Sequence, residues 1–442
     1  MQLWLDRVKR GTLLLPLAGM ATLASWGQDA EAMSPEDALA ISAYVDSSYL
    51  FLIGGLIVMF MAAGFLCLEA GMVRSKNAGM QSLKNVSLFS VAGLMFWLVG
   101  YNMAYPAESL FSGLVGIPDF IWAGEESLDT GYAASSDWFF QMVFVATAAS
   151  IVSGTVAERV KLWSFLAFVA VLAAFIYPIV VSWEWGAGYL DTEWGFSDFA
   201  GSTLVHSTGG WAALMGAIII GPRAGKYFGD TVNPMPGSNI PLAALGTFIL
   251  WFGWFGFNGA SQLAAGTFDD INAVATIFAN TNMAAVGGVL AAMTLTSILY
   301  KGKVDPTMAL NGAIGGLVSI TAEPLAPSMF GAVWIGAIGG VLVVLTVPLL
   351  DKLKIDDVVG AIPAHLVCGI WGTMVVPVYG DASFLGQFVG VALTGVFVCV
   401  ASAIVWMLLK VTIGVRVSEE DEQMGLDKAD TGVEAYPDFV SG

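Results

Sequence analysis

The sequence predicts an all-α polytopic membrane protein with eleven transmembrane helices, arranged as an inverted five-helix repeat (spans 1–5 and 6–10) plus an eleventh helix. Three observations carry this prediction. The 442 residues are 57% hydrophobic and 12% charged, which is too little polar surface for a soluble globule. Lys and Arg occur in alternate loops between the apolar segments. The only 2 histidines lie in two copies of one sequence pattern.

The first 32 residues have the order of a secretory signal peptide. Arg7, Lys9 and Arg10 precede an apolar run over residues 11–23, and small residues follow as far as Ala32. The run is shorter than a membrane span, as signal peptides are. We expect cleavage near residue 27 or 32, which leaves the mature N-terminus outside. An uncleaved amphipathic tail is the alternative. Residues 33–415 are then the helical domain, and 416–442 a cytoplasmic tail.

Eleven apolar segments of spanning length follow between clusters of charge. They are residues 48–72, 85–106, 138–157, 162–183, 199–221, 239–262, 271–300, 306–322, 328–350, 358–379 and 384–413. The segment 306–322 is the weakest, because it is at the lower limit of spanning length.

Beyond the first 32 residues, basic side chains occur only after odd-numbered spans. They are Arg74, Lys76 and Lys84, Arg159 and Lys161, Arg223 and Lys226, Lys301 and Lys303, Lys352 and Lys354, and Lys410, Arg416 and Lys428. Cytoplasmic loops hold the excess of Lys and Arg, so this predicts a cell (inner) membrane protein with its N-terminus outside and its C-terminus cytoplasmic. The other loops carry only acids and would attract cations. Acidic adaptation of an exposed surface is an alternative for the acids, but it does not explain the alternation of bases.

The segments 198–210 and 357–369 both have the pattern Asp-x7-His-x3-Gly, with His206 and His365 at its centre. In a helix that enters the membrane at its aspartate, the histidine lies about 12 Å deep in a core about 30 Å thick. Span five is predicted to enter from outside and span ten from inside, so the two imidazoles approach each other near the midplane. This is the geometry of inverted-repeat transporters. Gly210 and Gly369, one turn beyond, let a neighbouring helix approach closely.

Two imidazoles at this depth are expected to be neutral and hydrogen-bonded, because a charge without water is costly there. Together they offer one lone pair and one N–H to a small molecule. A metal site is one alternative, but two histidines without further ligands fall short of the usual number. Inert helix packing is another. We expect no metal and no cofactor, and we expect packing roles for Cys67, Cys368 and Cys399.

Three aromatic clusters lie at the predicted outer mouth, over residues 138–144, 183–185 and 251–261. A single Trp at a membrane interface is an anchor. Aromatic rings beside a hydroxyl and an acidic surface also bind a cation through the ring faces. The sequence therefore suggests a small cation caught outside and an uncharged species that passes two neutral imidazoles.

Four segments resemble the ammonium transporter family (Amt/Mep/Rh), on its Amt branch. They are Asp198-Phe-Ala-Gly-Ser-Thr-Leu-Val-His206, Gly253-Trp-Phe-Gly-Phe-Asn-Gly-Ala-Ser261, Val156-Ala-Glu-Arg159 and Gly71-Met-Val-Arg-Ser-Lys-Asn77. The resemblance covers nearly the whole mature chain. It implies a homotrimer of eleven-helix protomers, each with its own pore for ammonium or ammonia, and with methylammonium as a further substrate.

The resemblance also assigns roles to individual residues. It implies an outer ammonium-recruitment site of Phe144, Trp185 and Ser261. Phe144 stacked on Phe257 would be the gate, and His206 and His365 would line a hydrophobic pore. Asp198 would support the outer site, and it also suits a plain helix N-cap. The implied function is recruitment of ammonium, its deprotonation, and electrogenic conduction of ammonia with the proton.

Three residues are unusual for their positions in the predicted spans or in the family pattern. The family often has an acid where this chain has Gly360. Pro363 is expected to bend span ten. Glu69, in the inner part of span one, is expected to snorkel or to be hydrogen-bonded near the cytoplasmic end rather than to conduct protons.

The tail beyond residue 416 is acidic, and its composition alone is typical of disorder. The family's tail packs under neighbouring protomers and couples the pores to PII-type signal proteins, so the resemblance predicts order on assembly and a PII-type partner. An ammonium sensor of the same fold, with little flux, is the alternative function. An enzyme is disfavoured, because the chain has no recognisable nucleophile, cofactor loop or metal set.

Overall fold

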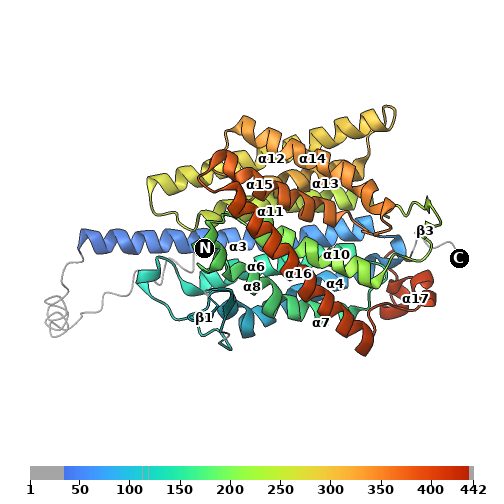
Figure 1. The fold of residues 1–442 in the computed structure, drawn as a ribbon, viewed down its shortest axis with the longest axis horizontal. Coiled ribbons are helices and arrows are strands. Elements are labelled where there is room, and N and C mark those ends of the chain that lie inside the picture. Colours follow the sequence, from blue (N-terminus) through green and yellow to red (C-terminus); the bar gives the residue numbers. More distant parts are fainter. Residues whose placement is uncertain (1–33, 112, 118, 438–442) are drawn as a thin grey trace, which may run out of the picture.

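The computed structural model describes residues 34–111, 113–117 and 119–437. The predicted signal peptide lies outside these residues. The described chain is a bundle of helices, most of which run along the horizontal axis of Figure 1. The hairpin of β1 (Ser109–Leu110) and β2 (Val115–Gly116) lies toward one end of the bundle. The hairpin of β3 (Tyr227–Phe228) and β4 (Thr231–Val232) lies at the other end, with α17 (Glu419–Met424).

Ten segments of the described chain are long and apolar enough to cross a membrane, which confirms a helical, multi-span membrane fold. Five of them are continuous helices, namely α3 (Pro35–Met72), α6 (Ala134–Thr155), α12 (Phe268–Leu299), α14 (Met329–Lys352) and α16 (Phe384–Thr412). The other five are each built from two or more consecutive helical elements. The first of these consists of η1 (Ser75–Asn77), α4 (Ala78–Met95), η2 (Phe96–Gly100) and α5 (Tyr101–Ala104), and the second of α7 (Leu162–Val171), η4 (Leu172–Ile176) and α8 (Tyr177–Ser182). The last three are η5 (Ser202–Ser207) with α10 (Thr208–Ile220), α11 (Ile240–Gly259) with η6 (Ala260–Gln262), and η7 (Ile362–Val367) with α15 (Cys368–Tyr379).

The predicted segment 306–322 coincides with the shorter apolar helix α13 (Pro306–Ile320). The remaining elements are η3 (Leu128–Thr130), α9 (Tyr189–Trp194) and η8 (Asp427–Thr431). An eleven-span count, the inverted repeat and the trimer stay predictions.

The ends of most helices lie within a few residues of the predicted boundaries, but the first two helices start earlier. The helix α3 begins at Pro35 rather than at residue 48, because the Ser34 hydroxyl accepts the amide of Asp37 at 3.0 Å and Pro35 suits the first turn. The second begins at Ser75 rather than at residue 85. Lys84 is therefore not in a loop. It is buried in α4 and donates to the carbonyl oxygen of Ser153 at 2.8 Å.

Small residues hold the two predicted halves together where α3 packs along α11. A Cβ on Gly246 would lie 2.3 Å from the amide nitrogen of Leu68, and one on Gly64 would lie 2.9 Å from Leu250. Only glycine allows this approach of the two backbones.

Loops that follow odd-numbered spans meet at one end of the bundle. The Glu158 carboxylate pairs with Arg74 at 2.5 Å and Arg223 at 3.4 Å, and Arg223 pairs with Asp356 at 2.9 Å. Glu158, Arg223 and Asp356 are buried. This cluster is named the basal ion network.

The tail is ordered against its own chain, contrary to what its composition suggests. The Glu422 carboxylate accepts the amide of Ala224 at 2.6 Å, and the Asp427 carboxylate accepts the amides of Gly79 and Met80 at 3.0 and 2.7 Å. These two amides open α4, so the carboxylate satisfies donors at a helix N-terminus.

Candidate functional site

Each histidine lies on a π-helical turn that follows an aspartate, of which Asp198 is buried and Asp357 is half-buried. His206 belongs to η5 and His365 to η7. The Asp198 carboxylate accepts four backbone amides at 2.7–2.9 Å, from Gly201, Ser202, Thr203 and Leu204. Burial raises the pKa of Asp198, although these four hydrogen bonds oppose the shift. Asp198 therefore holds the entry to η5, as an N-cap does.

Asp357 holds the second histidine segment in a similar way. Its carboxylate accepts the amide of Ile362 at 2.7 Å and the hydroxyl of Thr155 at 3.0 Å. Burial is also the largest cause of the raised pKa of Asp357.

A second pair of glycines was missed in the sequence. Gly201 (φ +105°) and Gly360 (φ +78°) each precede their histidine by five residues, in a left-handed conformation that favours glycine. The full pattern is therefore Asp-x2-Gly-x4-His-x3-Gly, which a direct alignment of the two segments would have revealed. Gly360 stands at its position because the backbone needs a glycine there.

The π-helical turn around His365 is not the effect of Pro363 alone. Pro363 lies in the first turn of η7, but η5 has the same π-helical form without a proline. Both histidines therefore lie on the same kind of turn.

The structure brings the two imidazoles into contact. The Nδ1 atoms of His206 and His365 are 3.3 Å apart, and the ring centroids are 5.2 Å apart. Both rings are buried. At this distance one Nδ1 donates and the other accepts, so two neutral rings of opposite tautomer fit the contact. The Nε2 atom of His206 has no partner among the described residues.

The glycines one turn beyond the histidines allow this contact, as expected from the sequence. A Cβ on Gly210 would lie 2.6 Å from the Cβ of Leu366, and one on Gly369 would lie 2.3 Å from the carbonyl oxygen of Ser202. Each glycine therefore packs against the other histidine's segment.

The three predicted recruitment residues line one cavity of about 330 Å³, together with several other aromatic side chains. Its lining includes Phe144, Trp185 and Ser261. The Trp185 indole N–H donates to the carbonyl oxygen of Asp198 at 2.9 Å, and the Ser261 hydroxyl donates to that of Phe257 at 2.8 Å. Asp198 thus fixes Trp185 through its backbone while its carboxylate caps η5.

Two stacked phenylalanines separate this cavity from the histidines. The rings of Phe144 and Phe257 are 4.0 Å apart at 23°, and both are buried. Phe257 lies 5.2 Å from the His206 ring, and Trp254 lies 5.0 Å from it on a stacked plane. The side chains between the cavity and the first imidazole are therefore apolar rings in contact with one another.

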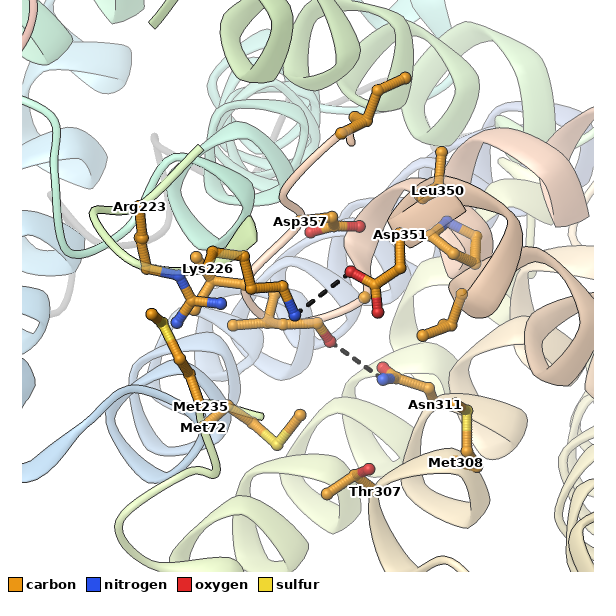
Figure 2. A pocket seen from close by; sticks show the side chains of 16 residues that line it. Met72, Arg223, Lys226, Met235, Thr307, Met308, Asn311, Leu350, Asp351 and Asp357 are labelled. Atoms are coloured by element: carbon orange, nitrogen blue, oxygen red, sulfur yellow. Dashed lines mark hydrogen bonds and ion pairs between the residues drawn. The ribbon is translucent and has the colours of Figure 1, made fainter. Parts of the chain in front are cut away.

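Two further cavities continue beyond the histidines. A small one of about 10 Å³ is lined by His365, Glu69, Asn311 and Val359 among others. Asn311 and Val359 also line a cavity of about 140 Å³, which Figure 2 shows. The three cavities, the phenylalanine pair and the histidine pair are thus contiguous, because each shares a lining residue or a ring contact with the next; this series is named the column.

Charged side chains gather around the cavity of about 140 Å³. Lys226 pairs with Asp351 at 3.2 Å, and the Asn311 amide donates to the carbonyl oxygen of Val359 at 2.9 Å, as the dashed lines in Figure 2 mark. Arg223 and Asp357 line the same cavity.

Two buried acids border the column. Asp137 lines the aromatic cavity of about 330 Å³ and accepts a hydrogen bond from the Tyr101 hydroxyl. The sequence reasoning missed it, although an acid beside Trp138 in the first turn of a span was a usable signal. Glu69 does not snorkel, because only 1% of it is exposed. It is hydrogen-bonded instead, which was the other expectation, and accepts from Asn85 at 2.7 Å and Ser153 at 2.8 Å. Within the described residues no group of three or more His, Cys, Asp or Glu side chains could hold a metal ion.

The comparisons with known proteins agree on one family. The sequence model of the Ammonium Transporter Family matches residues 49–436. Ammonium transporter Amt2 of Archaeoglobus fulgidus is 42% identical in an alignment over 422 residues, and the match covers 88% of each chain. A solved structure described as a Sensor Amt Protein is 35% identical, with a TM-score of 0.82 over 88% of this chain and 98% of that chain. Mep2 of Candida albicans, at 23% identity, shares the fold with a TM-score of 0.78 over 87% of this chain and 88% of that one. The chain belongs to the Ammonium Transporter Family, a family of membrane transport proteins rather than enzymes.

Proposed function

We propose that this protein takes up ammonium, removes a proton from it behind the outer cavity, and conducts ammonia past His206 and His365 while the proton crosses separately. The observation that supports it best is the column itself. An aromatic cavity with a hydroxyl leads through stacked Phe144 and Phe257 to two imidazoles in contact.

The outer cavity suits a small cation that donates hydrogen bonds. The ring faces of Trp185 and Phe144 attract a cation, and the Ser261 oxygen accepts an N–H. Phe144 and Trp185 meet edge to face, with ring centroids 6.0 Å apart. Ammonium and methylammonium both fit this chemistry.

The histidine pair suits an uncharged molecule. The rings are buried between Trp254, Phe257 and Phe65, so a hydrated ion loses its water without replacement. Ammonia needs only one lone pair and one N–H, which two neutral imidazoles supply. Potassium cannot shed charge by releasing a proton, and it is therefore excluded.

The test is transport by the purified protein in liposomes. We expect an ammonium gradient to drive a current and a parallel flux of ammonium, and a potassium gradient to drive neither. Flux without any current would contradict the electrogenic mechanism, and the absence of both would contradict transport.

An ammonium sensor is the second candidate, supported by the likeness to a Sensor Amt Protein and by the ordered tail. A sensor would bind ammonium with little flux. The liposome experiment separates the two functions, because a transporter shows sustained turnover.

We further propose a homotrimer of eleven-span protomers in the cell membrane, with the N-terminus outside and the tail cytoplasmic. The tail from residue 416 would be regulatory and would bind a PII-type protein. Light scattering of the purified protein tests the trimer, and N-terminal sequencing tests signal cleavage near residue 27 or 32. Binding of a PII-type protein to liposomes with and without the tail tests the partner.

A further inference from the structure

Glu69 is a buried acid that faces the column on the inner side of the histidines. It lies in α3, with 1% of it exposed, and it lines the same small cavity as His365. Nothing in the proposed path so far uses it.

The hydrogen bonds to Glu69 are one-sided. The Oε2 atom accepts the amide of Gln81, that of Asn85 at 2.7 Å and the hydroxyl of Ser153 at 2.8 Å. The Oε1 atom has no partner among the described residues. In Asp198, by contrast, each oxygen accepts two amides. Buried polar atoms are nearly always paired, so a free carboxylate oxygen beside a cavity indicates a proton or a ligand there.

The small cavity has room for one small polar molecule. Its volume of about 10 Å³ is close to the minimum for one water. Its lining includes the polar side chains of Ser150 and Asn311. One water or one ammonia in this space would have His365 and Glu69 among its neighbours.

We propose that Glu69 is the group at which ammonia regains its proton after it has passed the histidines. This inference rests on the proposed function. The O–H bond of the protonated carboxyl breaks and an N–H bond forms on ammonia, which gives ammonium and a carboxylate. The carboxylate is reloaded by the proton that the imidazole pair passes inward, through a water in the small cavity. The ammonium then enters the larger inner cavity, whose lining includes Asp351 and Asp357.

A purely structural role for Glu69 gives different expectations. The three donors to Oε2 come from α4 and α6, so the carboxylate also joins three helices. If that were its whole role, loss of a donor and loss of the acidic group would have similar effects.

The experiment compares three variants in liposomes, each checked for unchanged elution and melting temperature. Glu69→Gln keeps the size and one oxygen for the three donors, but it cannot carry the proton. We expect its maximal ammonium current to fall at least about tenfold at unchanged KM, because a positioned proton-transfer group contributes a factor of about 100 or more. Glu69→Asp should retain part of the current. Gln81→Leu, which removes one donor and leaves the acid, should keep most of it.

A measurement on the unaltered protein covers the case in which Glu69→Gln does not fold. Dicyclohexylcarbodiimide reacts with protonated carboxyls in apolar surroundings. We expect it to label Glu69, found by peptide mass spectrometry, in step with loss of current.

Wild-type current in folded Glu69→Gln, an equal loss in Gln81→Leu, or labelling of Glu69 without loss of current would each overturn the inference. These outcomes are distinct from failure of the proposed function, in which the unaltered protein gives no ammonium current or substitutions at His206 leave the current unchanged.

Discussion

Trp185 and Ser261 are the side chains proposed to bind the cation in the outer cavity. In Trp185→Leu we expect the KM for ammonium to rise about tenfold and discrimination against potassium to weaken, because a cation–π contact contributes about 1–2 kcal/mol. Ser261→Ala should raise KM by a similar factor through the lost acceptor. Current against ammonium concentration gives both values.

The matched control is Trp163→Leu, at a tryptophan that is 77% exposed and does not line the cavity. Its KM should stay at the wild-type value. An unchanged KM in both Trp185→Leu and Ser261→Ala would reject the recruitment site.

Asp198 offers a second test on a single side chain. Each of its carboxylate oxygens accepts two backbone N–H groups. In Asp198→Asn, the side-chain NH2 would replace one oxygen and face two of these N–H donors. We expect the variant to lose about 2 kcal/mol of unfolding free energy and much of its transport. Asp305→Asn is the control, because only one oxygen of Asp305 accepts hydrogen bonds, from Thr307 and Met308. Thermal unfolding in detergent compares them, and equal losses would contradict the capping role.

Individual elements were predictable where the same residues recur at the same spacing and each has a physical role. The two histidine segments were found because both carry an aspartate, a histidine and a glycine at fixed spacing. The π-helical turns were not, since hydropathy marks an apolar segment but not its hydrogen-bond pattern. Hydropathy likewise placed the start of α3 at residue 48, because the polar first turns of the helix lie outside the apolar segment.

The glycine before each histidine can be tested at the scale of its turn. A Cβ on Gly360 would meet Asn311 at 2.6 Å, and one on Gly201 would meet Val205 at 2.4 Å. Both are at positive φ, so we expect Gly360→Ala and Gly201→Ala each to cost about 1–3 kcal/mol and to reduce the current.

Gly131→Ala separates backbone strain from displacement of the histidine segments. Gly131 has φ +80° and nothing within 4 Å of its Cβ position. Its substitution should cost less stability and leave the current intact. A normal current in Gly360→Ala and Gly201→Ala would show that these turns do not position the imidazoles.

For the whole molecule, the sequence predicted which loops share an end but not how they are joined. The alternation of bases grouped Arg74 and Arg223 together, whereas their shared partner Glu158 is distant in sequence and was not predictable. The same holds for Glu69, whose partner Ser153 is 84 residues away. Contacts between distant segments leave no local pattern in one sequence.

The basal ion network is expected to stabilise the assembled bundle. Arg223→Ala removes one ion-pair partner of Glu158 and the ion-pair partner of Asp356. Because both carboxylates are buried, we expect the free energy of unfolding to fall by about 3–5 kcal/mol. The exposed pair of Lys428 and Glu434, at 3.6 Å, is the control, and Lys428→Ala should cost under about 1 kcal/mol. Equal melting temperatures of the two variants would contradict this.

The same network predicts a pH dependence that serves as a second readout. Burial alone would raise the pKa of Asp356, but Arg159 and Arg223 outweigh it and hold that pKa well below its usual range. The stabilisation is then fully present above the unfolded pKa of about 4 and is lost as pH falls below it. The melting temperature of the wild type should fall more steeply on acidification than that of Arg223→Ala.

Electrophysiology on histidine variants in liposomes tests the passage of neutral ammonia past His206 and His365 most directly. The variants are His206→Gln, His365→Gln, His206→Glu and the double alanine, each checked for intact assembly by size exclusion. We predict that the double alanine abolishes the coupled proton movement and strongly cuts the ammonium current. We also predict that His206→Glu admits potassium, because a carboxylate attracts the ion itself. Wild-type current and selectivity in all four variants would contradict the account.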